Sequence, residues 1–121
     1  MSRRAARRSA LFALYKWDLT GELELDARAD EYTRELVDRV CARAAELDER
    51  ITATAEGWTA DRLGVVERNV LRIAIHELEA RDVPPEVAID EAVTLAKRYA
   101  SEDAGKLVNG ILGRVAREEA A

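Results

Sequence analysis

Residues 65–80, VVERNVLRIAIHELEA, decide the fold of this chain, because they read as one helix with two apolar sides. One stripe at helical spacing holds Leu71, Ala74, Ile75 and Leu78, and the other holds Val66, Val70 and Ile73. A helix that is apolar on two sides is typical of a central element, since other helices cover it from both directions. We therefore expect residues 65 to about 80 to form the centre of a helical bundle.

The sequence after this stretch predicts two more helices. Val83-Pro84-Pro85 ends the central helix and begins the next one, with proline near its first turn. Apolar residues then recur at helical spacing, namely Ile89, Ala92, Val93, Ala96 and Ala100. Ser101 is a typical N-cap residue for the last helix, whose apolar face holds Val108, Ile111, Leu112 and Val115.

Helices also precede the central stretch. Ser2 is expected to cap a first helix that runs to about Leu19 and stops at Thr20-Gly21. Residues 22–29 read as a connection, helices are expected at about 30–47 and 48–56, and a short turn follows at 59–63. The sequence thus predicts an all-α fold of six or seven helices in two small packed bundles. Residues 1–121 are expected to form a single domain, with an N-terminal lobe to about residue 57 and a C-terminal lobe from about residue 58.

Composition excludes several classes of protein. With 48% hydrophobic and 36% charged residues, the 121-residue chain suits a packed helical domain rather than a disordered segment. Its single cysteine excludes an internal disulfide and fits the reducing cytoplasm. No apolar run approaches the roughly 20 residues that a membrane span needs, so we expect no membrane partner.

The sequence holds no motif for catalysis, cofactor binding or metal binding. There is no Gly-rich phosphate loop, and His76-Glu77 does not continue into the HExxH pattern of zinc proteases. One histidine and one cysteine cannot complete a zinc site. We therefore expect no enzyme activity, no catalytic residue, no cofactor and no metal.

Charge is distributed unevenly along the chain. Residues 1–17 carry a net charge of +5 from four arginines and one lysine, whereas the remaining residues carry −10. Such asymmetry indicates an anionic partner at the N-terminal end. A solvated, solubilising end is the alternative.

The first helix gathers its arginines on the side that later becomes apolar. At 100° per residue, Arg4, Arg8, Leu11 and Tyr15 share one side, and Arg3, Arg7 and Leu14 form the adjoining row. The first two turns are therefore expected to overhang the core and leave the guanidinium groups free. Arginine beside an aromatic ring favours single-stranded nucleic acid, because it pairs with phosphates while the ring stacks on bases. Tyr15 suits this role or a core position equally, and Trp17 is expected in the core.

Two segments carry a resemblance to a known family. RRAARRSALFALYKW (residues 3–17) and the stretch from Val65 to Ala116, with VLRIA-x-x-EL, VAI-x-EAV-x-LAK and KLVNG-x-L, resemble the bacterial transcription antitermination factor NusB. The resemblance covers about two thirds of the chain. It implies an all-helical fold of two small bundles. It also implies binding to the boxA element of nascent ribosomal RNA, together with the ribosomal protein called NusE in this role. The pair helps RNA polymerase read through terminators.

The resemblance also implies roles for individual residues. It assigns RNA contact to Arg3, Arg4, Arg7, Arg8, Tyr15, Glu67, Tyr99, Asp103, Lys106 and Leu107. Glu67 would in addition face the protein partner. Leu107 stands where other family members can carry an aromatic residue. The leucine removes a possible stacking surface for a base from this chain. The alternative role of Leu107 is packing in the core.

Two other readings of the function stay open at this point. The chain can be a helical protein-interaction module with no RNA role, or the RNA-binding part of a ribosomal RNA methyltransferase. Some members of the family form dimers that cover the RNA face, so both a monomer and a homodimer fit the sequence. The expected partners are boxA-like single-stranded RNA, NusE and, indirectly, the RNA polymerase antitermination complex, in the cytoplasm.

Overall fold

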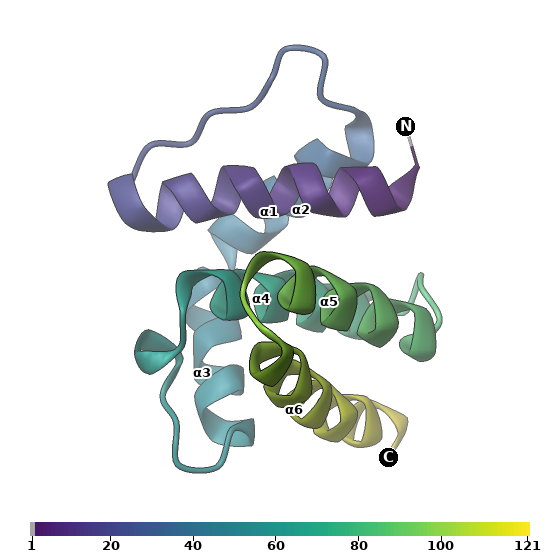
Figure 1. Ribbon diagram of the computed structural model, residues 1–121. Helices are drawn as coiled ribbons and strands as arrows, with labels where there is room; N and C mark the ends of the chain where they lie inside the picture. The colour runs from purple at the N-terminus through teal and green to yellow at the C-terminus, as the bar shows by residue number, and fades with distance from the viewer. Residues whose placement is uncertain (1) are drawn as a thin grey trace.

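In a computed structural model, which describes residues 2–121, the chain is all-helical, as predicted (Figure 1). Its helices are α1 (Arg3–Thr20), α2 (Glu31–Ala42), α3 (Ala44–Thr54), α4 (Val65–Ala80), α5 (Pro85–Tyr99) and α6 (Glu102–Ala120). A short 3₁₀ turn, η1 (Ala60–Arg62), precedes α4. The described residues thus form six α-helices, within the predicted range.

Helix α4 is the central element that its two apolar stripes predict. Val70, Leu71, Ile73 and Ile75 are all at most 2% exposed. The helix contacts α1, α2 and α3 on one side and α5 and α6 on the other. The hydrophobic contribution of this burial is therefore shared by the whole fold rather than by one pair of helices.

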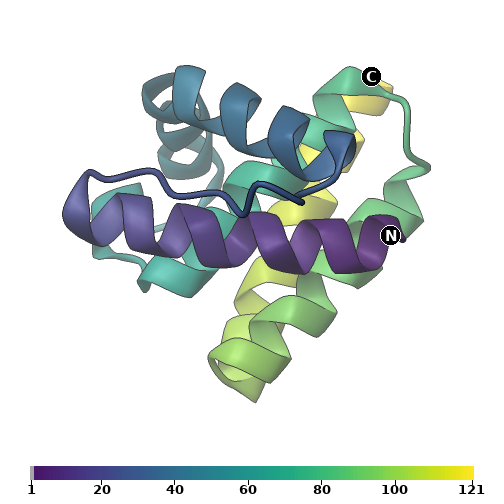
Figure 2. The same ribbon diagram turned by 90° about the horizontal axis from the view of Figure 1, so that it is seen from above.

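The helices lie in layers around α4. In Figures 1 and 2, α1 and α2 run across one side of the molecule, and α5 and α6 pack together on the opposite side of α4. The connection from Gly21 to Asp30 passes along α1 before α2 begins. One long side of α1 therefore stays open beside the junction of α5 and α6.

The helix ends follow the signals in the sequence. The Ser2 and Ser101 hydroxyl oxygens accept hydrogen bonds from the backbone N–H groups of Ala5 (3.2 Å) and Ala104 (3.0 Å). Gly21 ends α1 in the left-handed region, with φ 78°, where glycine carries no steric penalty. Pro85 occupies the first turn of α5.

One predicted boundary is wrong. The break between the second and third helices falls at Arg43, not at residues 47–48. The apolar spacing continues from Val40 to Leu47 through this point, so periodicity alone gives no sign of a break. The break coincides with a tertiary contact, because the Arg43 guanidinium pairs with Glu79 on α4 as well as with the nearby Glu46 on α3.

Candidate nucleic-acid interface

Two exposed arginines of α1, Arg4 and Arg8, share one side of the helix, whereas the exposed Arg3 lies against α2. Arg8 is exposed and has no ion-pair partner among residues 2–121. Arg3 is exposed too, with its guanidinium carbon 4.4 Å from the centre of the Tyr32 ring. Such cation–π contact leaves the edge of the guanidinium open to an anion.

Arg4 is exposed but already holds a carboxylate. Its Nε and Nη2 atoms donate to the Glu91 carboxylate of α5 at 3.1 and 2.9 Å. The Arg4 side chain is 77% exposed, so solvent screens this pair and a phosphate can compete with Glu91 for the same donors. Arg4 is thus available at the surface, although it is not without a partner.

The expectation of a free guanidinium is wrong for Arg7. This residue is 4% exposed, and its Nε and Nη2 atoms bind the buried Glu77 carboxylate of α4 at 3.0 and 2.9 Å. The Tyr32 hydroxyl of α2 donates to the same carboxylate. Burial alone would lower the pKa of Arg7, but the hydrogen bonds and charge of Glu77 outweigh it and raise that pKa. Arg7 therefore fastens α1 to the core and does not face a ligand.

Aromatic side chains follow the arginines along the same side of α1. Phe12 is 52% exposed and Tyr15 is 42% exposed. The half-buried Tyr99 of α5 meets Phe12 edge to face, with ring centres 5.1 Å apart. Together with Leu11 and Val66, these rings line a hollow of about 260 Å³. We call this the aromatic hollow.

Basic residues of α5 border the aromatic hollow. The Arg98 guanidinium carbon lies 5.4 Å from the centre of the Tyr99 ring, and Lys97 is exposed beside it in the sequence. Residues 97–99 thus repeat, on a second helix, the combination of cation and aromatic ring found on α1. Such a combination suits unpaired bases and their phosphates.

Glu67 is half-buried in the first turn of α4 and follows Val66 in the sequence. Val66 lines the aromatic hollow, but Glu67 does not. Its carboxylate folds back over Gly64, where an added Cβ would lie 2.5 Å from Glu67 Oε2. Glycine at position 64 therefore leaves room for this carboxylate at the helix N-terminus, where negative charge is favoured.

The remaining predicted residues lie on the first two turns of α6. Asp103 and Lys106 are exposed, whereas Leu107 is half-buried and packs against the core. Lys106 and Leu107 line a second hollow, separate from the aromatic hollow. The structure thus groups Tyr15 with Tyr99 in one hollow and Lys106 with Leu107 in another, and Glu67 lines neither.

Three residues of this surface were not singled out from the sequence. Phe12 lies one turn beyond Arg8, so extending the row from Arg4 to Arg8 by four residues would have found it. Lys97 and Arg98 stand in the last turn of α5, where basic residues also occur simply to offset the helix dipole. Their nearness to Tyr99 alone would have marked them.

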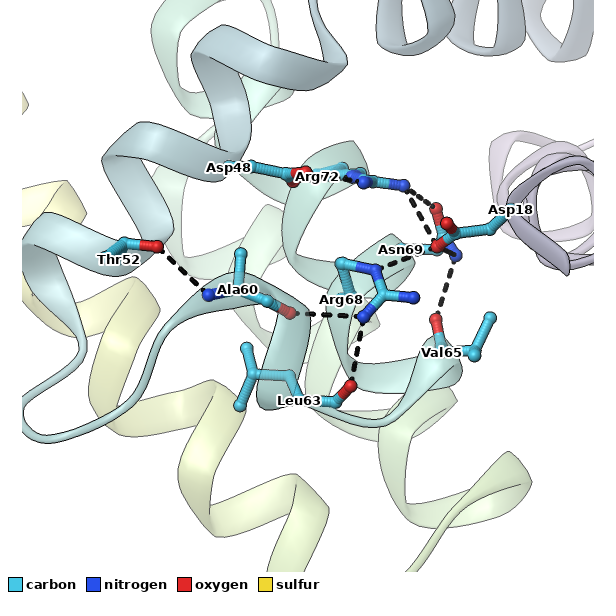
Figure 3. A network of polar contacts seen from close by, with 9 residues as sticks. All are labelled: Asp18, Asp48, Thr52, Ala60, Leu63, Val65, Arg68, Asn69 and Arg72. Carbon is cyan, nitrogen blue, oxygen red and sulfur yellow. Dashed lines mark hydrogen bonds and ion pairs between the residues drawn. The ribbon is translucent and has the colours of Figure 1, made fainter. Parts of the chain in front are cut away.

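A buried polar network fixes the other end of α1 (Figure 3). Asp18 Oδ2 accepts hydrogen bonds from Arg68 Nε at 2.8 Å, Asn69 Nδ2 at 3.0 Å and Arg72 Nη1 at 3.1 Å, all on α4. Burial raises the pKa of Asp18, but these donors outweigh burial and leave the pKa below its usual value. With Arg7 near one end and Asp18 near the other, α1 is fastened to α4 at two places.

Metal and membrane features are absent from the part of the chain that the structure describes. Within residues 2–121, no three His, Cys, Asp or Glu side chains are arranged to hold a metal ion. None of the helices described there is long and apolar enough to cross a lipid bilayer.

Comparison with known proteins identifies the family. A family model described as "NusB family" matches residues 4–117. The transcription antitermination protein NusB of Saccharopolyspora erythraea is 44% identical over 128 residues, covering 95% of this chain and 86% of that protein. A second, from Desulfitobacterium hafniense, is 38% identical over 130 residues, with 95% and 88% covered.

Solved structures give the same result. NusB of Thermotoga maritima matches with a TM-score of 0.88 and 36% identity, covering all of this chain and 94% of that one. A crystal structure of antitermination factors NusB and NusE in complex with double-stranded RNA matches with a TM-score of 0.84 and 35% identity, over 96% of both chains. The protein whose α1 carries these arginines and aromatic rings therefore belongs to the NusB family.

Proposed function

We propose that this protein is an RNA-binding transcription antitermination factor. In this role it binds a boxA-like, single-stranded stretch of nascent ribosomal RNA together with NusE. The complex then helps RNA polymerase to read through terminators in the cytoplasm. Family membership supports this proposal, since the curated relatives carry the name transcription antitermination protein. These names describe no catalysed reaction, in agreement with the prediction that the protein is not an enzyme.

The observation that carries the proposal is the open side of α1. Arg4 and Arg8 stand exposed there, two turns and one turn before Phe12 of the aromatic hollow. Arg3 is exposed at the start of the same helix, over the Tyr32 ring of α2. Their guanidinium groups suit successive phosphates, and the hollow suits a base. Because stacking in the hollow needs a base that is unpaired, this surface favours single-stranded over double-stranded RNA.

The partner surface is proposed to include Glu67. Glu67 is half-buried and follows Val66, which lines the aromatic hollow. We therefore expect a protein bound at this helix end to lie next to the RNA. Residues outside the first helix carry most of the acidic charge, which suits a basic ribosomal protein and repels RNA from other faces. Tyr15, Tyr99, Asp103 and Lys106 are proposed RNA contacts on the same grounds of position and exposure.

The alternative functions receive less support. The relatives named NusB align with this chain over 86% and 88% of their own lengths, which favours the antitermination factor over a part of a methyltransferase. A protein-interaction module without an RNA role would give the exposed arginines of α1 no anionic ligand. The experiment below separates this module from an RNA-binding factor.

An RNA titration tests the proposal. Labelled boxA-like RNA is titrated with the protein, with and without NusE, across a series of salt concentrations. Three phosphate contacts predict a slope of about −2 for log affinity against log salt. We expect boxA-like RNA to bind more tightly than a scrambled strand or a duplex, and NusE to strengthen the binding.

Charge reversal at Arg8 supplies the matched control. Arg8→Glu should weaken RNA binding at least about ten-fold, since it places a negative charge among the proposed phosphate contacts. Arg117→Glu reverses an equally exposed arginine in the last turn of α6 and should have little effect. Equal losses in the two variants would show that only net charge matters, and no binding by the wild type would refute the proposal.

A further inference from the structure

A second hollow lies between α6 and the segment that joins α3 to η1. It has a volume of about 280 Å³, and its lining includes Trp58, Lys106, Leu107, Gly110 and Arg114. Trp58 is 49% exposed, although tryptophan is among the most costly side chains to leave in water. Gly110 has no heavy atom within 4 Å of where a Cβ would stand, so the helix surface there is open. We call this the Trp58 hollow.

The backbone around Trp58 is held at both ends. Before it, the Ala55 N–H donates to the Ile51 carbonyl at 2.8 Å, and Gly57 turns the chain with φ 77°. After it, the Ala60 N–H donates to Thr52 Oγ1 at 3.0 Å, and Arg68 Nη1 donates to the Ala60 carbonyl at 3.1 Å (Figure 3).

The same arginine ties this segment to α1. Arg68 also binds the Leu63 carbonyl and, through Nε, the Asp18 carboxylate of α1. The exposed indole is therefore carried on a fixed segment that shares its anchor with the helix of the candidate interface. Binding of a ligand that stacks on the indole would therefore cost little entropy, because the segment is already ordered.

The Trp58 hollow holds one unpaired cation. Lys106 is exposed and has no ion-pair or hydrogen-bond partner among the described residues 2–121. Arg114 is already satisfied, since its Nη1 lies 3.1 Å from both Glu56 Oε1 and the Thr54 carbonyl oxygen. An ammonium beside an exposed aromatic ring again suits a phosphate and its base.

The start of α6 links the two hollows in the sequence. Tyr99, which lines the aromatic hollow, ends α5, and α6 begins at Glu102. The aliphatic part of Lys97 crosses α6 at Gly105, where an added Cβ would lie 2.5 Å from Lys97 Cγ, and its ammonium pairs with Glu102 at 3.9 Å. Lys106, the residue after Gly105, belongs to the Trp58 hollow.

We propose that Trp58 is a further RNA-contact residue, with an unpaired base of the same strand stacking on its indole and Lys106 binding the adjoining phosphate. This inference rests on the proposed function and extends its surface beyond the aromatic hollow. A basic protein partner fits the hollow less well, because the unpaired Lys106 ammonium would repel it.

The test combines variants of the protein with RNAs of different length. The boxA-like RNA is shortened one nucleotide at a time from each end. The affinity of each RNA is then measured for the wild type, Trp58→Ala, Trp58→Phe and Lys106→Gln. Trp58→Ala should weaken binding of the longest RNA at least about five-fold. Trp58→Phe should retain most of the affinity, since phenylalanine keeps an aromatic face.

A coupling between length and variant identifies the contact. Removal of one particular nucleotide should lower the affinity of the wild type by the same factor as the substitution Trp58→Ala. Removal of that nucleotide should not lower the affinity of Trp58→Ala any further. RNA of full length should also quench part of the tryptophan fluorescence in the wild type, and this part should be missing in Trp58→Phe. Val87→Ala, which trims an exposed apolar residue in the first turn of α5, should bind RNA as the wild type does.

Each other outcome overturns the inference. Wild-type affinity in Trp58→Ala, with the loss in Arg8→Glu preserved, would refute the Trp58 contact and leave the proposed function standing. Weaker NusE binding with unchanged RNA affinity would make Trp58 a protein contact instead. Absence of RNA binding in the wild type would refute both proposals. Circular dichroism checks folding. If Trp58→Ala does not fold, the quenching of tryptophan fluorescence by RNA of full length decides: it should be present in the wild type and partly missing in Trp58→Phe, and equal quenching in the two would refute the Trp58 contact.

Discussion

Arg7 and Arg8 are neighbours in α1 with the same side chain and different surroundings. Arg7 points inward and shares the buried Glu77 carboxylate with Tyr32, whereas Arg8 is exposed and unpaired among the described residues. A buried charge depends on its partner, because removal of one charge leaves the other in the interior without water or a counter-charge. The same substitution should therefore change folding at position 7 and ligand binding at position 8.

Removal of the Arg7 side chain should destabilise the fold strongly. Arg7→Ala leaves Glu77 buried without its cation, which costs about 3–5 kcal/mol of the free energy of unfolding. Urea denaturation measures this change, with Arg8→Ala as the control, for which we expect less than about 0.5 kcal/mol. The double variant Arg7→Met/Glu77→Leu should recover much of the loss. Equal stabilities of Arg7→Ala and Arg8→Ala would contradict a structural role for the buried pair.

At the scale of one element, α1 does two kinds of work along its length. Its open side carries Arg4, Arg8 and the aromatic rings, while Arg7 and Asp18 hold it to α4. A helix fixed at two places presents its side chains at fixed spacing, so the proposed phosphate and base contacts need little rearrangement on binding.

The Asp18 contacts should make this attachment depend on pH. Because the folded-state pKa of Asp18 is lowered, its ion pairs stabilise the protein above the unfolded pKa of about 3.9. This contribution is lost as pH falls through the lower pKa of the folded state. Wild type should thus exceed Asp18→Asn in stability at pH 7, and the gap should close below about pH 4.

Thermal unfolding of both proteins across the pH range measures this gap. Asp38→Asn is the control, since Asp38 is exposed on α2 and has no ion pair among residues 2–121. It should show no comparable closing of the gap. A gap between wild type and Asp18→Asn that stays constant down to acidic pH would argue against the ionised Asp18 as the anchor.

Most elements were predictable because their signals are local. Ser2, Gly21, Pro85 and Ser101 mark helix ends through their own backbone and side-chain chemistry. The break at Arg43 was not, since it coincides with a contact to Glu79 in another helix. Nor was the burial of Arg7, whose partner Glu77 is 70 residues away in the sequence. The helical wheel found the side of α1 that carries Arg4, Arg8 and Tyr15, but it could not tell which arginine would be buried in the core.

At the scale of the whole molecule, α4 is the element that every layer shares. It contacts the other five helices, and its first turn carries both Val66, which lines the aromatic hollow, and Glu67. The proposed RNA surface and the proposed partner surface therefore meet at one end of the central helix. The division into lobes near residue 57 stays a prediction, and α3 contacts α2 as well as α4 and α6.

Charge reversal at Glu67 should separate the two surfaces. Glu67→Lys should weaken NusE binding about ten-fold, because it brings a positive charge against a basic partner. RNA binding by the protein alone should be equal or stronger. Calorimetric titration with NusE measures the effect, and Glu86→Lys, an exposed reversal in the first turn of α5, is the control. Unchanged NusE affinity in Glu67→Lys would remove this residue from the partner surface.

The buried contact of Arg7, Glu77 and Tyr32 also limits how the protein can change over evolutionary time. Loss of Arg7 or Glu77 alone leaves the other buried without its partner, so single replacements at these two positions should be selected against. Substitutions at positions 7 and 77 are therefore expected to arise together in a lineage. Arg8 has no buried partner, so substitutions at position 8 are expected to accompany changes in the bound RNA. The two adjacent arginines should therefore be substituted independently of each other.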